Sequence, residues 1–364
     1  MDPAHATFRG RARFPSLDGL RFISILPVVW HHSTQRPLEG LLGRGPLGVH
    51  LFFAISGFLI TTLLLREREQ NQRIALGPFF ARRALRILPL YYAVLAIYAL
   101  RAALFMDDAP IRDHFVRSLP FYATYTGNWF VDYAVSHPVV FGFSWSLATE
   151  AQFYALWPPL VALTRGWKLP AALMAGFFCL DLATENGLLF GSSAMFVQIA
   201  TSLSAPICLG SLLAIALHRE TSFRWLSPVL GSKASSPLLL LGLLAAIAGD
   251  APLLSIHLLM VLVVGAVVVR EDHGLALPLD ASVPRFIGEV SYGIYLLHVS
   301  VITATKWILP GAEALVVFVV AAAASIGVAA LSYRYVEGPF LRLSKRFRPV
   351  SSATPASGSG GSCN

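Results

Sequence analysis

The sequence predicts an all-α polytopic integral membrane protein. Of its 364 residues, 55% are hydrophobic and only 13% are charged, whereas a soluble domain usually carries about 25% charged residues. Its mean hydropathy is +0.64. Apolar runs of about 20 residues, the length that crosses a bilayer as a helix, recur from one end of the chain to the other.

We expect ten transmembrane helices, at residues 17–33, 46–65, 87–106, 143–164, 169–189, 200–217, 236–250, 252–270, 286–309 and 313–333. With the N-terminus in the cytoplasm, this count places most of the 28 Lys and Arg residues in inner segments. Because basic residues are enriched in cytoplasmic loops, both termini are predicted to be cytoplasmic.

Residues 114–131 are the main ambiguity, because they are aromatic and moderately apolar. An eleventh span there would reverse every later loop and place the basic residues of 165–168 and 219–233 outside. We therefore expect a re-entrant or interfacial element within an outer loop, 107–142. The predicted organisation is a cytoplasmic N-terminal segment (1–13), a membrane domain (14–342) and a flexible cytoplasmic tail (343–364).

Several function classes are disfavoured by the composition. The three cysteines, Cys179, Cys208 and Cys363, are isolated and indicate neither a disulfide framework nor a metal site. Glycine-rich nucleotide loops and zinc-protease motifs are missing from the sequence. The basic residues flank membrane spans, which argues against nucleic-acid binding, so the function is expected to lie in the membrane bundle.

The first span, with the sequence DGLRFISILPVVWHH over residues 18–32, carries unusual polar groups. Arg21 and His32 are eleven residues apart, which places them on one helix face about 16 Å apart along the axis. Asp18 is three residues before Arg21, within ion-pairing range, whereas His31 points elsewhere. Ionisable groups within a span suggest function; the alternative is a snorkelling arginine and interfacial histidines.

The fourth span presents Ser146, Glu150, Tyr154 and Trp157 on one face. A buried carboxylate needs a partner because an unpaired buried charge is costly. In the ten-span topology Glu150 lies near the depth of His32, which suggests a histidine–carboxylate pair. The alternative is a structural salt bridge.

Arg82, Arg83 and Arg86 stand immediately before the third span. Arg83 and Arg86 share a face and could hold phosphate bidentately; the alternative is simple anchoring at the inner surface. Four other polar residues within spans could serve either function or packing and interface contacts: His50, Ser56, Tyr295 and His298.

Six segments together resemble the membrane acyltransferase-3 family. They are LDGLRFISILPVVWHH, GVHLFFAISGFLI, RRALRILPLYY, FSWSLATEAQFYALWP, SYGIYLLH and RYVEGPF, in order across nearly all of residues 14–342. The resemblance implies transfer of an acyl group, usually acetyl from acetyl-CoA, to a hydroxyl of a sugar or related acceptor. Many relatives carry a fused SGNH-type domain, so this chain is similar to the stand-alone members.

The resemblance also assigns residues. Arg21 and His32 match the paired Arg/His motif, Arg83 and Arg86 the Arg-x-x-Arg motif, and Glu150 the acidic position of the Trp-Ser-Leu motif. The expected catalytic residues are thus His32, Glu150 and Arg21, with His32 either a general base or an acyl carrier. Arg83 and Arg86, supported by Arg82, would hold the CoA phosphates. Candidate acceptor or oxyanion contacts are His50, Ser56, Tyr295 and His298.

The expected protein is therefore a multi-pass O-acyltransferase of the bacterial cytoplasmic (inner) membrane, with no permanently bound cofactor and no metal. Its expected partners are acyl-CoA, the lipid bilayer and a carbohydrate, glycolipid or small glycoside acceptor. Acyl chain length, oligomeric state and the side of acceptor access stay open. An alternative is a transporter or flippase for a glycan precursor, against which the lack of inverted repeats counts mildly. A structural subunit is a third, for which buried Arg, His and Glu would be unneeded.

Overall fold

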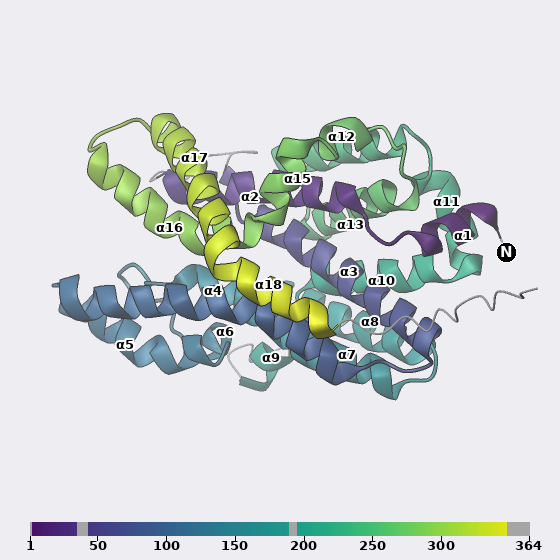
Figure 1. Cartoon of the computed structure of the whole chain (residues 1–364), viewed down its shortest axis with the longest axis horizontal. Coiled ribbons are helices and arrows are strands. Elements are labelled where there is room, and N and C mark those ends of the chain that lie inside the picture. Colours follow the sequence, from purple (N-terminus) through teal and green to yellow (C-terminus); the bar gives the residue numbers. More distant parts are fainter. Residues whose placement is uncertain (1, 35–42, 189–194, 348–364) are drawn as a thin grey trace, which may run out of the picture.

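The computed structural model describes residues 2–34, 43–188 and 195–347, and the regular secondary structure within these ranges is helical (Figure 1). The elements are α1 (Pro3–Gly10), α2 (Pro15–Ser33), α3 (Leu47–Asn71), α4 (Leu76–Phe105), α5 (Ala109–Ala123), α6 (Gly127–Phe130), η2 (Gly142–Ser144), α7 (Trp145–Leu163), α8 (Lys168–Glu185), α9 (Met195–Ala200), α10 (Ala205–His218), α11 (Glu220–Leu230), α12 (Ser235–Ala248), α13 (Leu253–Val269), α14 (Ala276–Leu279), α15 (Ser282–Glu289), α16 (Ser291–Ile308), α17 (Ala314–Ser332), η3 (Tyr333–Glu337), α18 (Gly338–Ser344) and η4 (Lys345–Phe347).

Each of the ten predicted spans overlaps a helix, but their lengths differ from the prediction. By length and apolar composition, three helices of the described chain could cross a membrane: α3, α4 and the continuous run Ala314–Phe347. The number rises to five if two sharply bent pairs, α11 with α12 and α15 with α16, each count as one span. The helical, multi-pass class is therefore supported, while the ten-span count stays a prediction.

Two predicted boundaries are corrected by the structure. Helix α4 begins at Leu76, so the arginines of 82–86 lie on the helix itself and not before it. The predicted span 286–309 is broken at Val290, where α15 and α16 meet at 73°. The break lets α15 lie against α2, where a Cβ on Gly288 would come within 1.8 Å of the Asp18 carbonyl oxygen.

The segment 107–142, predicted to be an outer loop, contains helix α5, which turns back beside α4 (Figure 1). Tyr91 and Tyr92 of α4 donate hydrogen bonds of 2.8 Å to the carbonyls of Tyr122 and Ala123 at the end of α5. These bonds hold the end of α5 against α4. The loop is thus an ordered helical element that packs against the third predicted span.

Helix α3 lies at the centre of the bundle, and most of its side chains are buried. It packs closely on α10 through two glycines that face the partner backbone. A Cβ on Gly57 would lie 2.2 Å from the Ile207 carbonyl oxygen, and one on Gly210 would lie 2.2 Å from that of Ala54. Small residues allow such close approach between membrane helices, so Gly57 serves to pack α3 against α10.

We expect Gly57→Ala to lower the stability of the protein by about 1–3 kcal/mol, the usual cost of overpacking. The added methyl group would force α3 and α10 apart. Thermal unfolding of the purified protein in detergent measures this. Gly327→Ala on α17 is the matched control, because a Cβ there meets nothing within 4 Å. Equal melting temperatures for both variants would contradict the packing argument.

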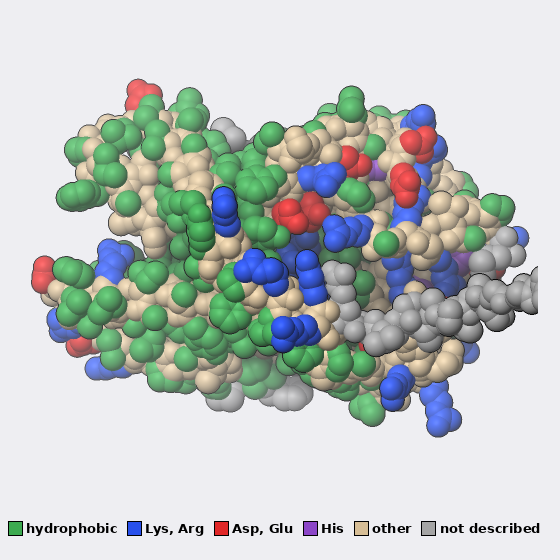
Figure 2. Space-filling view, viewed as in Figure 1, with side chains coloured by type: hydrophobic (Ala, Val, Ile, Leu, Met, Phe, Trp, Pro, Cys, Tyr) green, Lys and Arg blue, Asp and Glu red, His purple; other side chains and the backbone are tan. Residues whose placement is uncertain are grey.

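The surface has apolar regions and a basic region. Large apolar side chains are exposed on α4 and α17, among them Ile97, Leu100, Leu104 and Val319, as expected for faces that contact lipid. Figure 2 shows that Lys and Arg side chains gather over α18 and toward the N-terminus, in the middle and right of the view. This distribution agrees with a basic cytoplasmic face.

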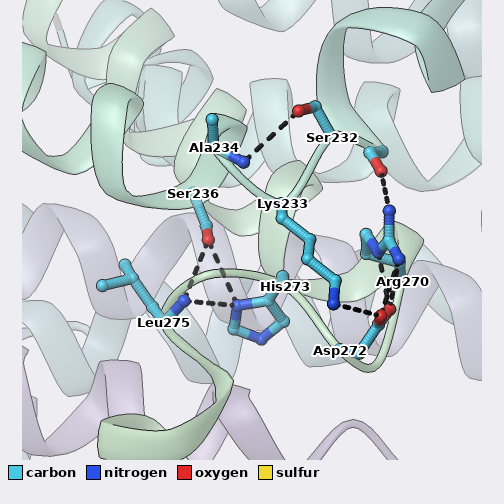
Figure 3. Close-up of polar contacts among 9 residues, drawn as sticks. Ser232, Lys233, Ala234, Ser236, Arg270, Asp272, His273 and Leu275 are labelled. Carbon is cyan, nitrogen blue, oxygen red and sulfur yellow. Dashed lines mark hydrogen bonds and ion pairs between the residues drawn. The ribbon is translucent and has the colours of Figure 1, made fainter.

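A network of hydrogen bonds holds the start of α2, and Figure 3 shows the part of it around His273. Ser16 donates to Asp280 at 2.7 Å, so its oxygen is free to accept from His273 Nε2, 2.9 Å away. On the other side of the ring, Nδ1 lies 3.2 Å from both the Leu275 N–H and the Ser236 hydroxyl. The backbone N–H can only donate, so His273 is neutral with its proton on Nε2.

Asp272, the neighbour of His273, is held by two cations. Its carboxylate makes two hydrogen bonds of 2.7 Å with Arg270 and lies 3.2 Å from Lys233 (Figure 3). Hydrogen bonds from Arg270 and Lys233 lower the pKa of Asp272. Arg270 also donates to the Gly231 carbonyl at 2.9 Å, which ties this loop to the α11–α12 turn.

Burial lowers the pKa of His273 from 6.5, because the charged ring is disfavoured there. Since the unfolded chain binds this proton more readily, His273 contributes stability above pH 6.5 that is lost as the pH falls below it. We therefore expect the melting temperature of the wild type to drop between pH 7.5 and 5.5 by more than that of His273→Asn. His114→Asn, at a partly exposed histidine on α5, should keep the wild-type drop; a similar drop in His273→Asn would contradict this assignment.

Candidate active site

A central cavity of about 90 Å³ lies between α2, α3, α4, α7 and α16. One water needs about 10–15 Å³ on this measure, so the cavity holds several waters or a small polar group. Its polar and aromatic lining comes from these five helices and includes Arg21, Ser56, Arg83, Arg86, Ser146, Glu150, Tyr154, Ser291, Tyr292 and Tyr295.

Glu150 is the acidic residue of this cavity. It accepts a hydrogen bond of 2.6 Å from Ser56 of α3 and a second one from Tyr154, one turn further along α7. The same face of α7 continues to Trp157, which donates to Thr61 of α3 at 2.8 Å. The predicted polar face of α7 is therefore confirmed, and its hydrogen bonds hold α7 against α3.

Arg83 and Arg86 both line the cavity, as expected for residues three apart on α4. In the described residues neither guanidinium has a hydrogen bond or a carboxylate within 4 Å. The Arg83 guanidinium lies 5.4 Å from the centre of the Tyr154 ring, and Glu150 acts on it only at longer range. Two partly buried guanidiniums without close counter-ions favour a negatively charged ligand.

A second, larger cavity of about 740 Å³ adjoins the first on the side of α1 and α18. It is lined by one acidic residue, Glu67, and by seven arginines: Arg9, Arg11, Arg13, Arg66, Arg82, Arg83 and Arg86. Arg83 and Arg86 thus belong to both cavities. We call the larger one the arginine cavity and the smaller one the central cavity.

The arginines around the arginine cavity are in part structural. Arg66 donates to the carbonyls of Phe8 and Arg11 at 3.0 and 2.5 Å, and so holds α1 against α3. Arg82 lies 3.6 Å from Glu67 and donates to the Phe347 carbonyl. Arg82 is therefore engaged with protein groups, unlike Arg83 and Arg86.

The two polar residues of α2 lie at different levels of the bundle. Arg21 is at the central cavity and forms the predicted ion pair with Asp18, at 2.8 Å. His32, three turns further, contacts His298 of α16: its Nδ1 lies 3.3 Å from His298 Nε2 and 2.9 Å from the Val28 carbonyl.

The predicted pair of His32 and Glu150 is wrong for this structure. Glu150 lines the same cavity as Arg21, and Arg21 is about 16 Å along α2 from His32. Glu150 therefore lies at the level of Arg21, where its hydrogen-bond donors are Ser56 and Tyr154.

The remaining candidates fall into separate places. Ser56 and Tyr295 line the central cavity, and His298 lies beside His32. His50 is apart from them, with its Nδ1 2.8 Å from Nε2 of His257 on α13. Within the described ranges no three His, Cys, Asp or Glu side chains come together as metal ligands would.

Two contributors were missed by the sequence reasoning. Tyr292 lines the central cavity and donates to the Ile87 carbonyl at 2.7 Å. Lys306 lies 3.5 Å from the His32 carbonyl oxygen. The spacing of Tyr292, one turn before Tyr295, was a usable signal; Lys306 had none beyond its charge near the end of a span.

The comparisons with known proteins show the family to which this chain belongs. A family model described as an acyltransferase domain matches residues 14–334. Peptidoglycan O-acetyltransferase OatA of Listeria monocytogenes is 30% identical over 358 residues, which cover 90% of this chain and 56% of that protein. O-acetyltransferase OatA of Staphylococcus aureus is 25% identical over 353 residues, covering 89% and 57%.

A putative O-acetyltransferase of S. aureus strain COL is 30% identical over 358 residues, covering 90% of this chain and 57% of that protein. The chain thus spans just over half the length of these relatives. No solved structure matches it.

The helical bundle, its apolar surface and its buried Arg, His and Glu side chains define a multi-pass membrane protein with an internal polar site. The chain belongs to the membrane acyltransferase-3 family.

Proposed function

We propose that this protein is an O-acyltransferase of the bacterial cytoplasmic membrane that transfers an acetyl group from cytoplasmic acyl-CoA to a hydroxyl of a glycan-type acceptor. The observation that carries the proposal is the pair of adjoining cavities, which share Arg83 and Arg86. Neither guanidinium has a counter-ion within 4 Å in the described structure. The relatives named as O-acetyltransferases support the reaction class.

The donor would enter through the arginine cavity. Coenzyme A carries several phosphates, and guanidinium groups bind phosphate through charge-assisted, often bidentate, hydrogen bonds. The arginine cavity, with about 740 Å³, has the size of ordinary ligand sites. The phosphates of coenzyme A would pair with Arg83 and Arg86, while Arg82 supports the fold beside them.

The acyl group would then move from the central cavity toward His32. The line of travel follows α2 and α16, because Arg21 and Tyr295 line the cavity while His32 and His298 lie beyond it on the same two helices. The distance from Arg21 to His32, about 16 Å by helix geometry, is of the order of an extended pantetheine arm.

His32 would supply the base. In a direct transfer it takes the proton of the acceptor hydroxyl, the oxygen attacks the thioester carbonyl, and the C–S bond breaks to release CoA thiolate, which takes that proton. In a two-step transfer the imidazole attacks the thioester carbonyl first and its N–H proton leaves with the CoA thiolate; the acceptor hydroxyl then takes the acyl group and its proton returns to the imidazole. Arg21 would assist from the level of the central cavity, where Glu150 orders Ser56 and Tyr154.

The acceptor would be a carbohydrate, a glycolipid or a small glycoside. One relative is named for peptidoglycan, and a glycan hydroxyl fits the same chemistry. Ser56 and Tyr295 supply hydroxyl groups at the central cavity for polar contacts with donor or acceptor.

We expect His32→Ala to lower acetyl-CoA turnover by about 10²–10⁴-fold, the usual contribution of a general base, with donor affinity unchanged. Turnover is measured as free CoA released by detergent-purified protein in the presence of a glycan acceptor. His31→Ala is the matched control, since its ring is adjacent in sequence but has no contact with His298. Full activity in His32→Ala would overturn the assignment.

We expect Arg83→Gln and Arg86→Gln each to weaken acetyl-CoA binding by about 10–100-fold, because a hydrogen bond to a charged group contributes about 1.5–3 kcal/mol. Isothermal titration with acetyl-CoA measures this. Arg165→Gln, at an exposed arginine outside both cavities, should bind as the wild type does. If the wild type neither binds nor consumes acyl-CoA, the transporter alternative takes its place.

A further inference from the structure

His298 is fully buried on α16, and its hydrogen bonds determine which nitrogen carries a proton. Its Nδ1 lies 2.6 Å from the Tyr295 carbonyl oxygen. A carbonyl oxygen can only accept a hydrogen bond, so Nδ1 must be the N–H donor. In the neutral ring Nε2 then has a lone pair, and this lone pair faces His32 Nδ1 at 3.3 Å.

The same logic determines the state of His32. Its Nδ1 lies 2.9 Å from the Val28 carbonyl oxygen, one turn earlier on α2. Both neighbours of this Nδ1 are acceptors, so it carries the proton and is shared between Val28 and His298. The lone pair of neutral His32 is therefore on Nε2, which has no hydrogen bond in the described residues.

We infer that His298 is the positioning residue for His32, acting through a neutral imidazole where catalytic triads use a carboxylate. The inference rests on the proposed function. His298 selects the tautomer of His32 in which Nε2 is the base. It also accepts a hydrogen bond from the imidazolium that forms when His32 takes up a proton.

The surroundings of His32 explain why His298 matters. The charged or titratable groups that face it are His31, at 5.2 Å between ring centres, Lys306 and His298 itself. Among the described residues no carboxylate acts on it. A protonated His32 thus depends on the Val28 carbonyl and on His298 Nε2.

The ring of His298 is itself held rigidly. It packs against the rings of Phe143 and Tyr295, each 5.6 Å away between centres. Tyr295 in turn donates to the Phe143 carbonyl at 2.8 Å and lies 2.6 Å from the Ser146 hydroxyl. Because Tyr295 and Ser146 line the central cavity, these contacts connect the cavity wall to the histidine pair.

During transfer His298 neither gains nor loses a proton. The acceptor hydroxyl proton goes to His32 Nε2, the new C–O bond forms as the thioester C–S bond breaks, and the proton passes from His32 to the CoA thiolate. His298 keeps its own proton on Nδ1 throughout, because the Tyr295 carbonyl holds it there.

The experiment compares His298→Ala and His298→Phe, neither of which has an acceptor for His32 Nδ1–H, with wild type for acetyl-CoA turnover across pH 5–9. We expect kcat to fall about 10–100-fold, as for other residues that orient a reactive histidine, with KM for acetyl-CoA within about twofold. The acid limb of the pH–rate profile should move to lower pH, because protonated His32 has lost an acceptor.

The matched control is His257→Ala. His257 is also a buried membrane-helix histidine whose ring nitrogen lies 2.8 Å from a second histidine, His50, but away from His32. We expect a comparable change in melting temperature with kcat and pH profile close to wild type. If His298→Ala fails to fold, His298→Phe, which fills the space of the ring without an acceptor, carries the same comparison.

Two results would overturn the inference: a kcat within twofold of wild type in the folded His298 variants, or losses equal to those of His257→Ala with an unchanged pH profile. The proposed function fails separately, through an inactive wild type or an active His32→Ala. An inactive His32→Ala together with fully active His298 variants would reject only the role of His298.

Discussion

The site depends on the placement of Arg83 and Arg86 inside the bundle without close counter-ions. Removing a guanidinium from water costs several kcal/mol unless other groups replace the lost interactions. The aromatic ring of Tyr154 and the more distant carboxylate of Glu150 do this in part. The protein thus keeps charge available on α4, which a phosphorylated donor would use and an uncharged solute would not.

Helix α2 sets the distance between the level of that charge and the proposed base, because it carries Arg21 at one level and His32 at the other. Its position is constrained by close backbone contacts, since a Cβ on Gly48 of α3 would lie 2.2 Å from the Ser24 carbonyl oxygen. The Ser16–Asp280–His273 network holds its N-terminal end. A shift of α2 would therefore disturb both levels together.

Helix α16, like α2, carries polar residues at both levels of the bundle. Tyr292 and Tyr295 line the central cavity, and His298 follows one turn later beside His32. The bend at Val290 separates this segment from α15, which lies against the start of α2. Helix α16 thus connects the central cavity with the histidine pair and, through the bend, with the start of α2.

The sequence alone was sufficient for properties that depend on a single helix. The Asp18–Arg21 ion pair, the shared face of Arg83 and Arg86 and the polar face from Ser146 to Trp157 follow from the helical repeat, which is a local property. The six motifs were sufficient for the family, and the apolar runs for the membrane class.

The relative height of two helices is not a local property, because it results from contacts between them. Examples are Gly57 of α3 against α10 and Gly288 of α15 against α2. For that reason the sequence placed Glu150 beside His32, whereas tertiary packing places it at the level of Arg21. Packing also brings His298 to His32 and His257 to His50, pairs separated by 266 and 207 residues. No periodicity within one helix could reveal which side chains would meet across such separations.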